Sequence, residues 1–240
     1  MKRGEIMNDV LGQYNYSNEN LYSHWNYLNI NAQGMMSSCY CKKSFFRALN
    51  TYEDKLDVQL NEIIMAESLN AGEFTRYVKL QPGSYRAKIY ESGSKNLIFE
   101  SVVEIDQNLA YTGVITKDEE DEGDLSVLMI PEAKENNNKG KMTGVRLVNL
   151  VEAPNLELVA NGAILFSGVD YGEASNNVAV PSGRYTLSLQ EKQNKSIVKT
   201  MSVDFAPGMH YTIFVSGNCN ENPNIKIIIP EDGVNYLELC

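Results

Sequence analysis

The stretch that decides the fold class is residues 156–167, which read LELVANGAILFS. Two apolar-rich runs flank Asn161-Gly162, and both central positions of the commonest two-residue hairpin turn require a positive φ that Asn and Gly tolerate. The pattern therefore predicts a β-hairpin with one strand over 156–160 and the next over 163–167.

Further strand-like segments continue on both sides of this hairpin. Pro181-Ser182-Gly183 has the chemistry of a turn, and the residues from Arg184 to Leu189 alternate with a period of two. Strands are also predicted over 145–151, 175–180, 184–189, 196–205, 209–216 and 224–229. Short strands separated by turn signals at this spacing predict an antiparallel β-sandwich.

The first half of the chain repeats this pattern. Six of its residues recur one hundred positions later, namely Asn61, Gly72, Gly83, Tyr85, Tyr111 and Thr112. The segment Arg47-Ala48-Leu49-Asn50 likewise matches Arg146-Leu147-Val148-Asn149. Strands are predicted near 45–49, 56–60, 63–66, 74–80, 85–91, 97–105, 110–116 and 125–130. A sustained register of this kind predicts two copies of one domain, with the repeated tyrosines packed inside each sandwich.

We therefore expect an all-β chain of two tandem antiparallel Ig-like β-sandwich domains behind an irregular N-terminal arm. A length of 240 residues suits two domains of this size. The predicted bounds are an Asn/Tyr-rich arm over 1–43, sandwiches over 44–133 and 143–232, a polar linker over 134–142, and a C-terminal tail over 233–240.

Several of these stretches resemble a family of bacterial Ig-like domains of unknown function, DUF4397. Residues 180–185, VPSGRY, resemble the family's Leu-Pro-Ala-Gly-x-Tyr turn, and residues 207–212 resemble its Gly-x-x-Tyr-Thr strand start. The other matching stretches are residues 145–149 and 156–162 in the second copy and residues 80–85 and 111–112 in the first. The resemblance spans roughly residues 44–232. It implies an Ig-like fold in a mostly exported family without assigned catalytic residues.

Composition and charge narrow the function. The formal net charge is −10 with a pI near 4.8, which disfavours binding to nucleic-acid phosphates. No apolar run reaches the roughly 18–20 residues of a transmembrane helix, so membrane insertion is not expected. Polar residues follow Lys2 and Arg3 where a secretion signal needs an apolar region. We expect synthesis in the cytoplasm without a Sec signal, and a final place at a spore surface or cell surface.

The sequence does not favour an enzyme. Its two histidines, His24 and His210, lie in the arm and at a predicted strand start. It contains no nucleophile elbow, phosphate loop or His-Glu-x-x-His motif, so we predict no catalytic residue and no cofactor.

One acidic run is a weak calcium candidate. Asp118, Glu120, Glu122 and Asp124 carry the hard oxygen ligands that Ca²⁺ prefers. An EF-hand register starting at Asp118 would however place Met129 where the bidentate glutamate belongs. The other interpretation is a solvated hairpin tip, and we predict no metal site.

The four cysteines are the most informative polar feature. Cys39, Cys41, Cys219 and Cys240 all lie outside the predicted core strands. We predict them as intermolecular disulfide candidates, because thiols on an arm, a loop and a terminus reach neighbouring molecules. Zinc binding by the same four is the alternative, although Cys39-x-Cys41 is shorter than the usual zinc spacing.

We therefore expect a non-enzymatic structural or assembly protein of a bacterial surface or spore layer, such as a spore coat. It would self-associate through its arm and its peripheral cysteines, with itself or other surface-layer proteins as partners. Residues 26–43 of the arm would add as a strand to a neighbour's exposed sheet edge. The alternative is an adhesive or carbohydrate-binding module, with ligand contacts on the loops Glu67–Glu73 and Gly168–Gly172.

Overall fold

The structure is a computed structural model, and it describes residues 43–118, 125–132, 140–151, 156–217 and 224–239. These residues belong to one compact unit. The strands of the first repeat are β1 (Ser44–Asn50), β2 (Leu56–Leu60), β3 (Ile63–Leu69), β4 (Val78–Leu80), β5 (Gly83–Glu91), β6 (Leu97–Ile105), β7 (Ala110–Lys117) and β8 (Leu125–Glu132).

The second repeat follows the same order. Its strands are β9 (Met142–Leu150), β10 (Leu156–Ala160), β11 (Ala163–Ser167), β12 (Val178–Pro181), β13 (Gly183–Glu191), β14 (Ile197–Phe205), β15 (His210–Ser216) and β16 (Lys226–Ile228). A short 3₁₀ turn, η1 (Gly233–Asn235), follows β16. Nowhere in the described ranges is there a helix long and apolar enough to cross a membrane.

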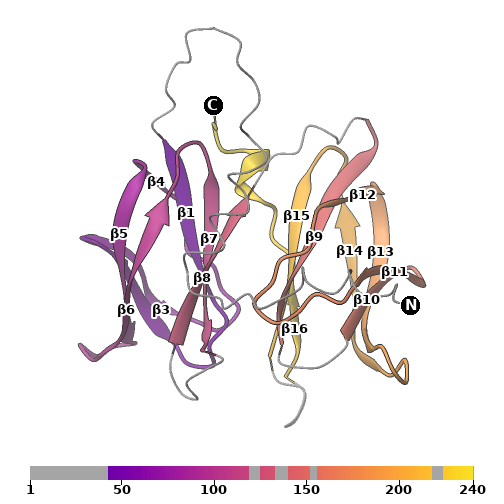
Figure 1. Cartoon of the computed structure of the whole chain (residues 1–240), viewed down its shortest axis with the longest axis horizontal. Coiled ribbons are helices and arrows are strands. Elements are labelled where there is room, and N and C mark those ends of the chain that lie inside the picture. Colours follow the sequence, from indigo (N-terminus) through magenta and orange to yellow (C-terminus); the bar gives the residue numbers. More distant parts are fainter. Residues whose placement is uncertain (1–42, 119–124, 133–139, 152–155, 218–223, 240) are drawn as a thin grey trace, which may run out of the picture. The chain divides into compact units, whose positions relative to one another are not determined.

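Each repeat folds into two four-stranded sheets around a core (Figure 1). In the first repeat the sheet orders are β4-β1-β7-β8 and β3-β2-β5-β6, and in the second they are β12-β9-β15-β16 and β11-β10-β13-β14. The two sets match strand for strand. The prediction of an all-β chain with two tandem sandwiches is therefore confirmed.

One strand pair in each repeat differs from the antiparallel expectation. β1 and β7 run parallel, with Arg47 opposite Thr112, and β9 and β15 run parallel, with Arg146 opposite Thr212. The other paired strands in the described part are antiparallel. Alternation along a strand indicates which face is buried, but it carries no information on the direction of the neighbouring strand.

The predicted hairpin over 156–167 forms as β10 and β11. Asn161 takes a φ of 49°, and its Oδ1 accepts the Thr186 N–H at 2.8 Å. In the first repeat Asn61 has a φ of 50° and accepts the Arg86 N–H at 2.7 Å, although Glu62 replaces the glycine. The asparagine tolerates the left-handed backbone and also supplies the acceptor, so both turns form.

Two predicted strands are shorter than the alternation suggested. The segment predicted over 74–80 pairs only as β4, and the one over 175–180 only as β12. Thr75 Oγ1 accepts the Ala48 N–H at 2.9 Å, and Ser175 Oγ accepts the Leu147 N–H at 2.9 Å. A side-chain oxygen thus occupies the place of a main-chain carbonyl in each ladder, and regular pairing stops there.

The repeated tyrosines pack as predicted. Tyr111 and Tyr211 are buried in the two sandwich cores, and Tyr85 and Tyr185 pack against the same cores while partly exposed. The hydroxyl of Tyr85 donates to the Gln81 carbonyl, as that of Tyr185 does to the carbonyl four residues before it, both at 2.8 Å. These tyrosines thereby fix the turn that enters β5 or β13.

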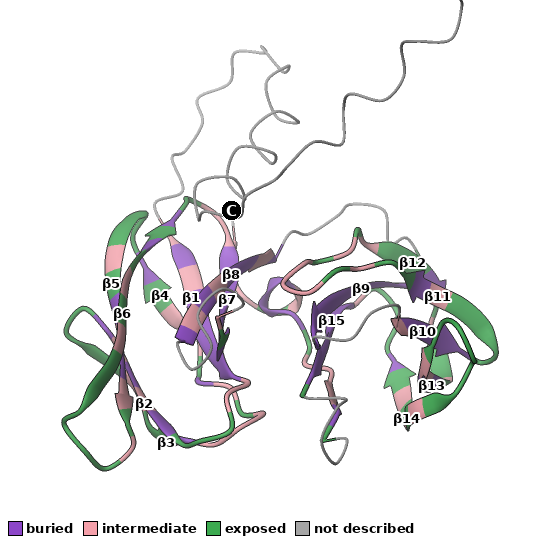
Figure 2. Cartoon of the chain, turned by 60° about the horizontal axis from the view of Figure 1, so that its bottom comes forward, coloured by how far each residue is buried: buried purple, intermediate pink, exposed green. Residues whose placement is uncertain are grey.

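A third apolar cluster joins the two repeats. It is made of Leu49, Val114, Ile130, Val148, Leu150 and Phe214. These side chains come from the sheets β4-β1-β7-β8 and β12-β9-β15-β16, which we call the inner sheets; the other two are the outer sheets. β9 and β15 are accordingly coloured as buried along nearly their whole length (Figure 2). Each inner sheet therefore packs against its own sandwich core on one face and contributes to this third cluster on the other.

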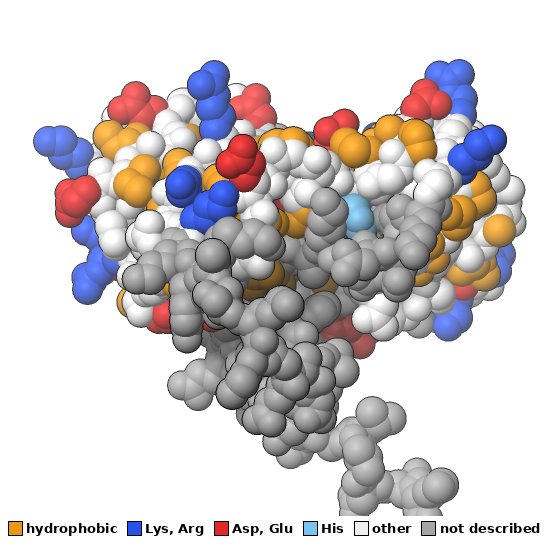
Figure 3. Space-filling model, turned by 90° about the horizontal axis from the view of Figure 1, so that it is seen from above, with side chains coloured by type: hydrophobic (Ala, Val, Ile, Leu, Met, Phe, Trp, Pro, Cys, Tyr) orange, Lys and Arg blue, Asp and Glu red, His pale blue; other side chains and the backbone are white. Residues whose placement is uncertain are grey.

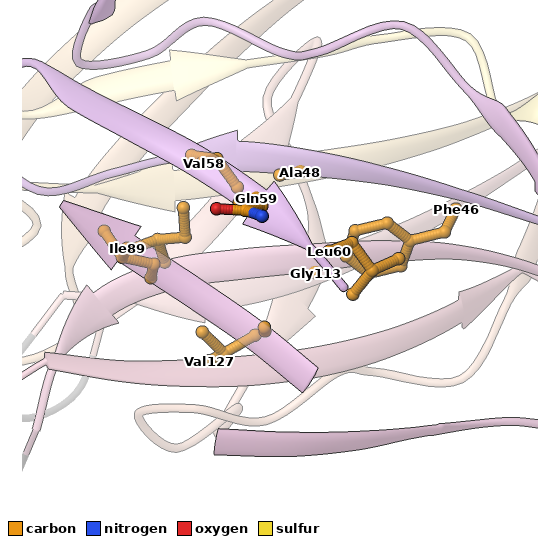
Figure 4. A pocket seen from close by; sticks show the side chains of 10 residues that line it. Phe46, Ala48, Val58, Gln59, Leu60, Ile89, Gly113 and Val127 are labelled. Carbon is orange, nitrogen blue, oxygen red and sulfur yellow. The ribbon is translucent and has the colours of Figure 1, made fainter. Parts of the chain in front are cut away.

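A small cavity lies inside the first sandwich (Figure 4). It encloses about 10 Å³ and is lined mainly by apolar side chains, among them Phe46, Leu60, Ile89 and Val127. Binding pockets for small molecules measure roughly 300–1,000 Å³. This cavity is therefore a packing gap beside Phe46 and not a ligand site.

Candidate functional site

The structure leaves the predicted disulfide candidates untested. Cys39, Cys41, Cys219 and Cys240 all lie outside the described residues. Their role in cross-linking stays a prediction.

The weak calcium candidate is also largely outside the described part. Asp118 is described and partly exposed, whereas Glu120, Glu122 and Asp124 are not described. Within the ranges that are described, no group of three or more His, Cys, Asp or Glu side chains is placed to hold a metal ion.

The two loops predicted as ligand contacts take part in the junction between the repeats. The Tyr171 hydroxyl donates to the Lys117 carbonyl at 3.0 Å and lies 3.1 Å from Thr116 Oγ1. Lys226 Nζ donates to the Ala71 carbonyl at 3.2 Å. Part of each loop is therefore used within the chain.

A buried polar cluster lies at the same junction, and we call it the interface cluster. Its members are Arg47, Tyr77, Thr112 and Glu132 from the first repeat and Arg146, Thr212, Asp232 and Gly233 from the second. Arg47 and Arg146 occupy equivalent places on β1 and β9, and each is only 5% exposed. The Nε of each donates at 2.9 Å to the threonine opposite it on the parallel strand.

The two arginines also reach across the junction in a reciprocal way. Arg146 Nη1 donates to the Pro131 carbonyl of the first repeat at 2.7 Å. Arg47 Nη1 donates to the Glu231 carbonyl of the second repeat at 3.4 Å. Each repeat thus contributes a cation that binds main-chain oxygen near the end of the other.

Glu132 is the centre of the cluster and is 1% exposed. Its Oε1 accepts from Arg47 Nη2 at 3.3 Å, from Thr112 Oγ1 at 3.2 Å and from the Tyr77 hydroxyl. Its Oε2 accepts the Gly233 N–H at 2.5 Å. Burial raises the pKa of Glu132, the nearby Asp232 carboxylate adds to that rise, and Arg47 opposes it.

Aromatic rings complete the surroundings of Arg47. Its guanidinium carbon lies 4.5 Å from the ring centre of Phe74 and 4.6 Å from that of Tyr77, which are cation–π distances. Burial raises the pKa of Tyr77, so its hydroxyl stays protonated and remains a donor to Glu132.

The second half of the cluster is less complete. The Asp232 N–H donates to the His210 carbonyl at 3.0 Å, which places Asp232 in the position that Glu132 holds opposite Ala110. Asp232 is one methylene shorter than Glu132. Among the described atoms, Asp232 Oδ1 and Arg146 Nη2 are buried without a hydrogen-bond partner. The repeat symmetry therefore holds for the arginines and breaks at the carboxylates.

The cluster has the chemistry of a clamp. Glu132 and the two arginines are buried and hydrogen-bonded to side chains or main-chain groups of this chain, so both oxygens of Glu132 already accept from donors of its own chain. In the sequence, Arg47 and Arg146 stand out only as markers of the repeat. The signal for their role was a cation recurring inside an otherwise apolar strand, since a buried charge requires a partner.

The outer surface adds no single-sign patch on the face shown in Figure 3. There, lysine and arginine side chains are interspersed with aspartate and glutamate over the described residues.

Comparison with known proteins gives distant structural relatives. No curated protein matches the chain. One solved structure that it resembles is a carbohydrate-binding module of family 26 from Eubacterium rectale in complex with maltoheptaose. The identity is 10% and the TM-score 0.26, over 79% of this chain and 97% of that one. Another is a candidate cell adhesion protein from Bacteroides fragilis, at 10% identity and a TM-score of 0.22, over 75% and 85% of the two chains. At these TM-scores the likeness does not bear on a ligand.

The family comparison is decisive where the structural one is weak. The model of DUF4397, a domain of unknown function, matches residues 44–157 and again residues 143–235. The second match covers the second repeat, and the first match covers the first repeat and continues to Glu157 in β10. The chain belongs to the DUF4397 family and carries two tandem copies of its domain.

Proposed function

We propose that this protein is a non-enzymatic structural subunit that self-associates in a bacterial surface layer, of which a spore coat is one kind. The observation that carries the proposal is the joining of the two inner sheets through Leu49, Val148 and Phe214. Because the inner sheets cover each other, contacts with other molecules fall on the outer sheets, on their edge strands and on the arm.

The construction of the junction suits a load-bearing role. An apolar cluster and a buried polar cluster hold the repeats together, and Glu132 connects Arg47 of the first repeat to Gly233 of the second. Two sandwiches joined in this way form a stiff element. Arg47, Glu132 and Arg146 are engaged in that junction, which leaves them unsuited to turnover of a substrate.

The proposed mechanism combines edge strands with covalent linkage. Residues 26–43 of one molecule would add to a sheet edge of a neighbour, where main-chain hydrogen bonds supply affinity. Disulfides from Cys39 or Cys41 to Cys219 or Cys240 would then lock the contact in an oxidising place.

Electron microscopy and size-exclusion chromatography of the full chain, with and without reductant, test this proposal. We expect high-mass assemblies without reductant that shrink when reductant is added, and a matching ladder on non-reducing gels. A monomer under both conditions at all concentrations would rule the proposal out.

The second candidate is an adhesive or carbohydrate-binding module. Parts of both predicted ligand loops are exposed, at Glu67-Ser68, which the structure places in β3, and at Gly168 and Asp170, and that exposure is what supports it. A glycan array probed with monomeric protein distinguishes the two. Saturable binding to one class of glycan would favour the module, and binding to none would favour the structural subunit.

A further inference from the structure

In the described part of the chain the four sheets end in eight edge strands, and most of these edges are protected against pairing. An exposed edge offers unpaired N–H and C=O groups to another chain, and proteins block it with short strands, proline, bulges or inward-pointing charges. β4 and β16 have three residues each and β12 has four. β8 and β12 also contain a proline, Pro131 and Pro181.

The remaining edges lie on the outer sheets. Pairing of β3 with β2 is irregular at two places around Val58, and β11 has five residues with one irregularity beside Leu158. β14 is nine residues long, but it carries Lys199, which is exposed and lies opposite the core residue Leu189. A lysine on an edge strand disfavours the addition of a second strand to the sheet.

β6 is the exception among the described edges. It has nine residues, Leu97–Ile105, without proline, glycine, lysine or arginine, and its register with β5 is regular from Phe99 to Ile105. Phe99 stands where β14 has Lys199, and it packs against the core of the first repeat. Ile98 and Val102 are 39% and 55% exposed on this edge. The lysine that protects β14 in the second repeat thus has no counterpart on β6 in the first.

The sequence of β6 is complementary to itself in antiparallel pairing. With complete overlap, Ser101 lies opposite Ser101 of a second copy, and Val102 lies opposite Glu100. No two carboxylates face each other in this register, and Glu100 is already paired with Arg86 Nη1 at 2.5 Å. A shift that places Val102 opposite itself sets Glu100 against Glu104, and like charges directly opposite are unfavourable. The complete overlap is therefore the preferred register.

We propose that β6 is a docking edge through which two copies of this chain pair antiparallel over residues 97–105. The four-stranded sheet β3-β2-β5-β6 of one copy and the same sheet of the second copy then form one sheet of eight strands. This inference rests on the proposed function, because it assumes self-association, and it adds the strand, the partner and the register. Pairing of β6 with itself closes on a dimer, so larger assemblies need the arm and the cysteines.

The decisive variant is Val102→Glu in the full chain, studied under reductant by sedimentation velocity across a dilution series. Each new carboxylate lies opposite Glu100 of the second copy, and two-fold symmetry makes this repulsion occur twice. We expect the dimer dissociation constant to rise about tenfold or more. Within the chain, position 102 lies opposite Arg86, which accommodates a glutamate, so the fold is retained.

The matched control is Ser202→Glu on β14. It occupies the same place in the second repeat, opposite Thr186, and adds the same charge. We expect the dimer dissociation constant to be unchanged. Equal weakening by both variants would mean a general charge effect and would overturn the proposal.

Hydrogen exchange of the wild type supplies the second readout. Amides in residues 97–105 should become more protected as concentration rises, while those in 197–205 should not. If residues 97–105 were as protected in the dilute monomer as at high concentration, a segment of the same chain would cover β6. That result would overturn the proposal that a second copy pairs with β6. Assemblies that persist unchanged in Val102→Glu would overturn the docking edge alone, whereas a wild type that is monomeric with and without reductant would overturn the proposed function as well.

Discussion

Glu132 Oε2 in the first repeat accepts the main-chain N–H of Gly233 in the second repeat at 2.5 Å. The two residues are 101 positions apart in the chain, and one of them is a buried carboxylate that also binds Arg47. This contact makes the end of the second repeat part of the first. The two repeats should therefore unfold together.

Glu132→Ala tests that coupling. The substitution leaves buried donors on Arg47, Tyr77 and Gly233 without their acceptor, and we expect a loss of about 3 kcal/mol in the free energy of unfolding. Urea unfolding followed by circular dichroism measures it. The control Glu100→Ala removes an exposed ion pair with Arg86 and should cost less than about 1 kcal/mol. Similar losses in the two variants would contradict a special role for the junction.

The pH dependence of stability follows from the raised pKa of Glu132. The Glu132 carboxyl holds its proton more tightly in the folded protein than in the unfolded chain, where its pKa has the ordinary value of 4.5. The stability that Glu132 contributes is therefore present below pH 4.5 and is lost as pH rises toward the folded-state pKa. Glu132→Gln lacks this titration, so its free energy of unfolding relative to the wild type should increase as pH is raised from 4. A constant difference across pH 4–8 would show that Glu132 does not titrate with folding.

A pair of core residues offers a compensation test. A Cβ added at Gly113 would lie 2.6 Å from Phe46 Cζ, so Gly113→Ile should cost at least about 2 kcal/mol by overpacking. The equivalent residues of the second repeat are Ile213 and Val145, both buried. Adding Phe46→Val to Gly113→Ile should recover most of the loss, and a double-mutant cycle from chemical unfolding gives the coupling. Additive losses would show that the two positions do not share space.

Lys199→Phe should open a second docking edge. It gives β14 the residue that β6 carries at the equivalent position, and so it removes the lysine charge that disfavours pairing. Under reductant we expect dimers to be replaced by species that lengthen with concentration, measured by light scattering after size exclusion. Lys199→Arg keeps the charge and should behave as the wild type; lengthening in both variants would remove the charge as the cause.

Local patterns predicted much of this fold and little of its junction. Turn residues such as Asn161-Gly162 and the alternation of Arg184–Leu189 are local, so the hairpins and the sandwich class could be predicted from them. The partnership of Arg47 with Glu132 spans 85 residues and depends on β1 and β8 flanking β7 in one sheet, which no local period encodes. The parallel pairing of β1 with β7 is hidden for the same reason. The predicted roles of Cys39, Cys41, Cys219 and Cys240 remain predictions.

The covalent union of two repeats has a consequence for how many neighbours one molecule can hold. Two identical single domains joined through their inner sheets would present two equal outer edges, and unprotected edges at both ends lead to open-ended growth. In one chain the two halves diverge independently, as Phe99 and Lys199 show. In the proposed pairing β6 is the one docking edge of the molecule, so edge pairing by itself stops at two copies and larger assemblies depend on the arm and the cysteines.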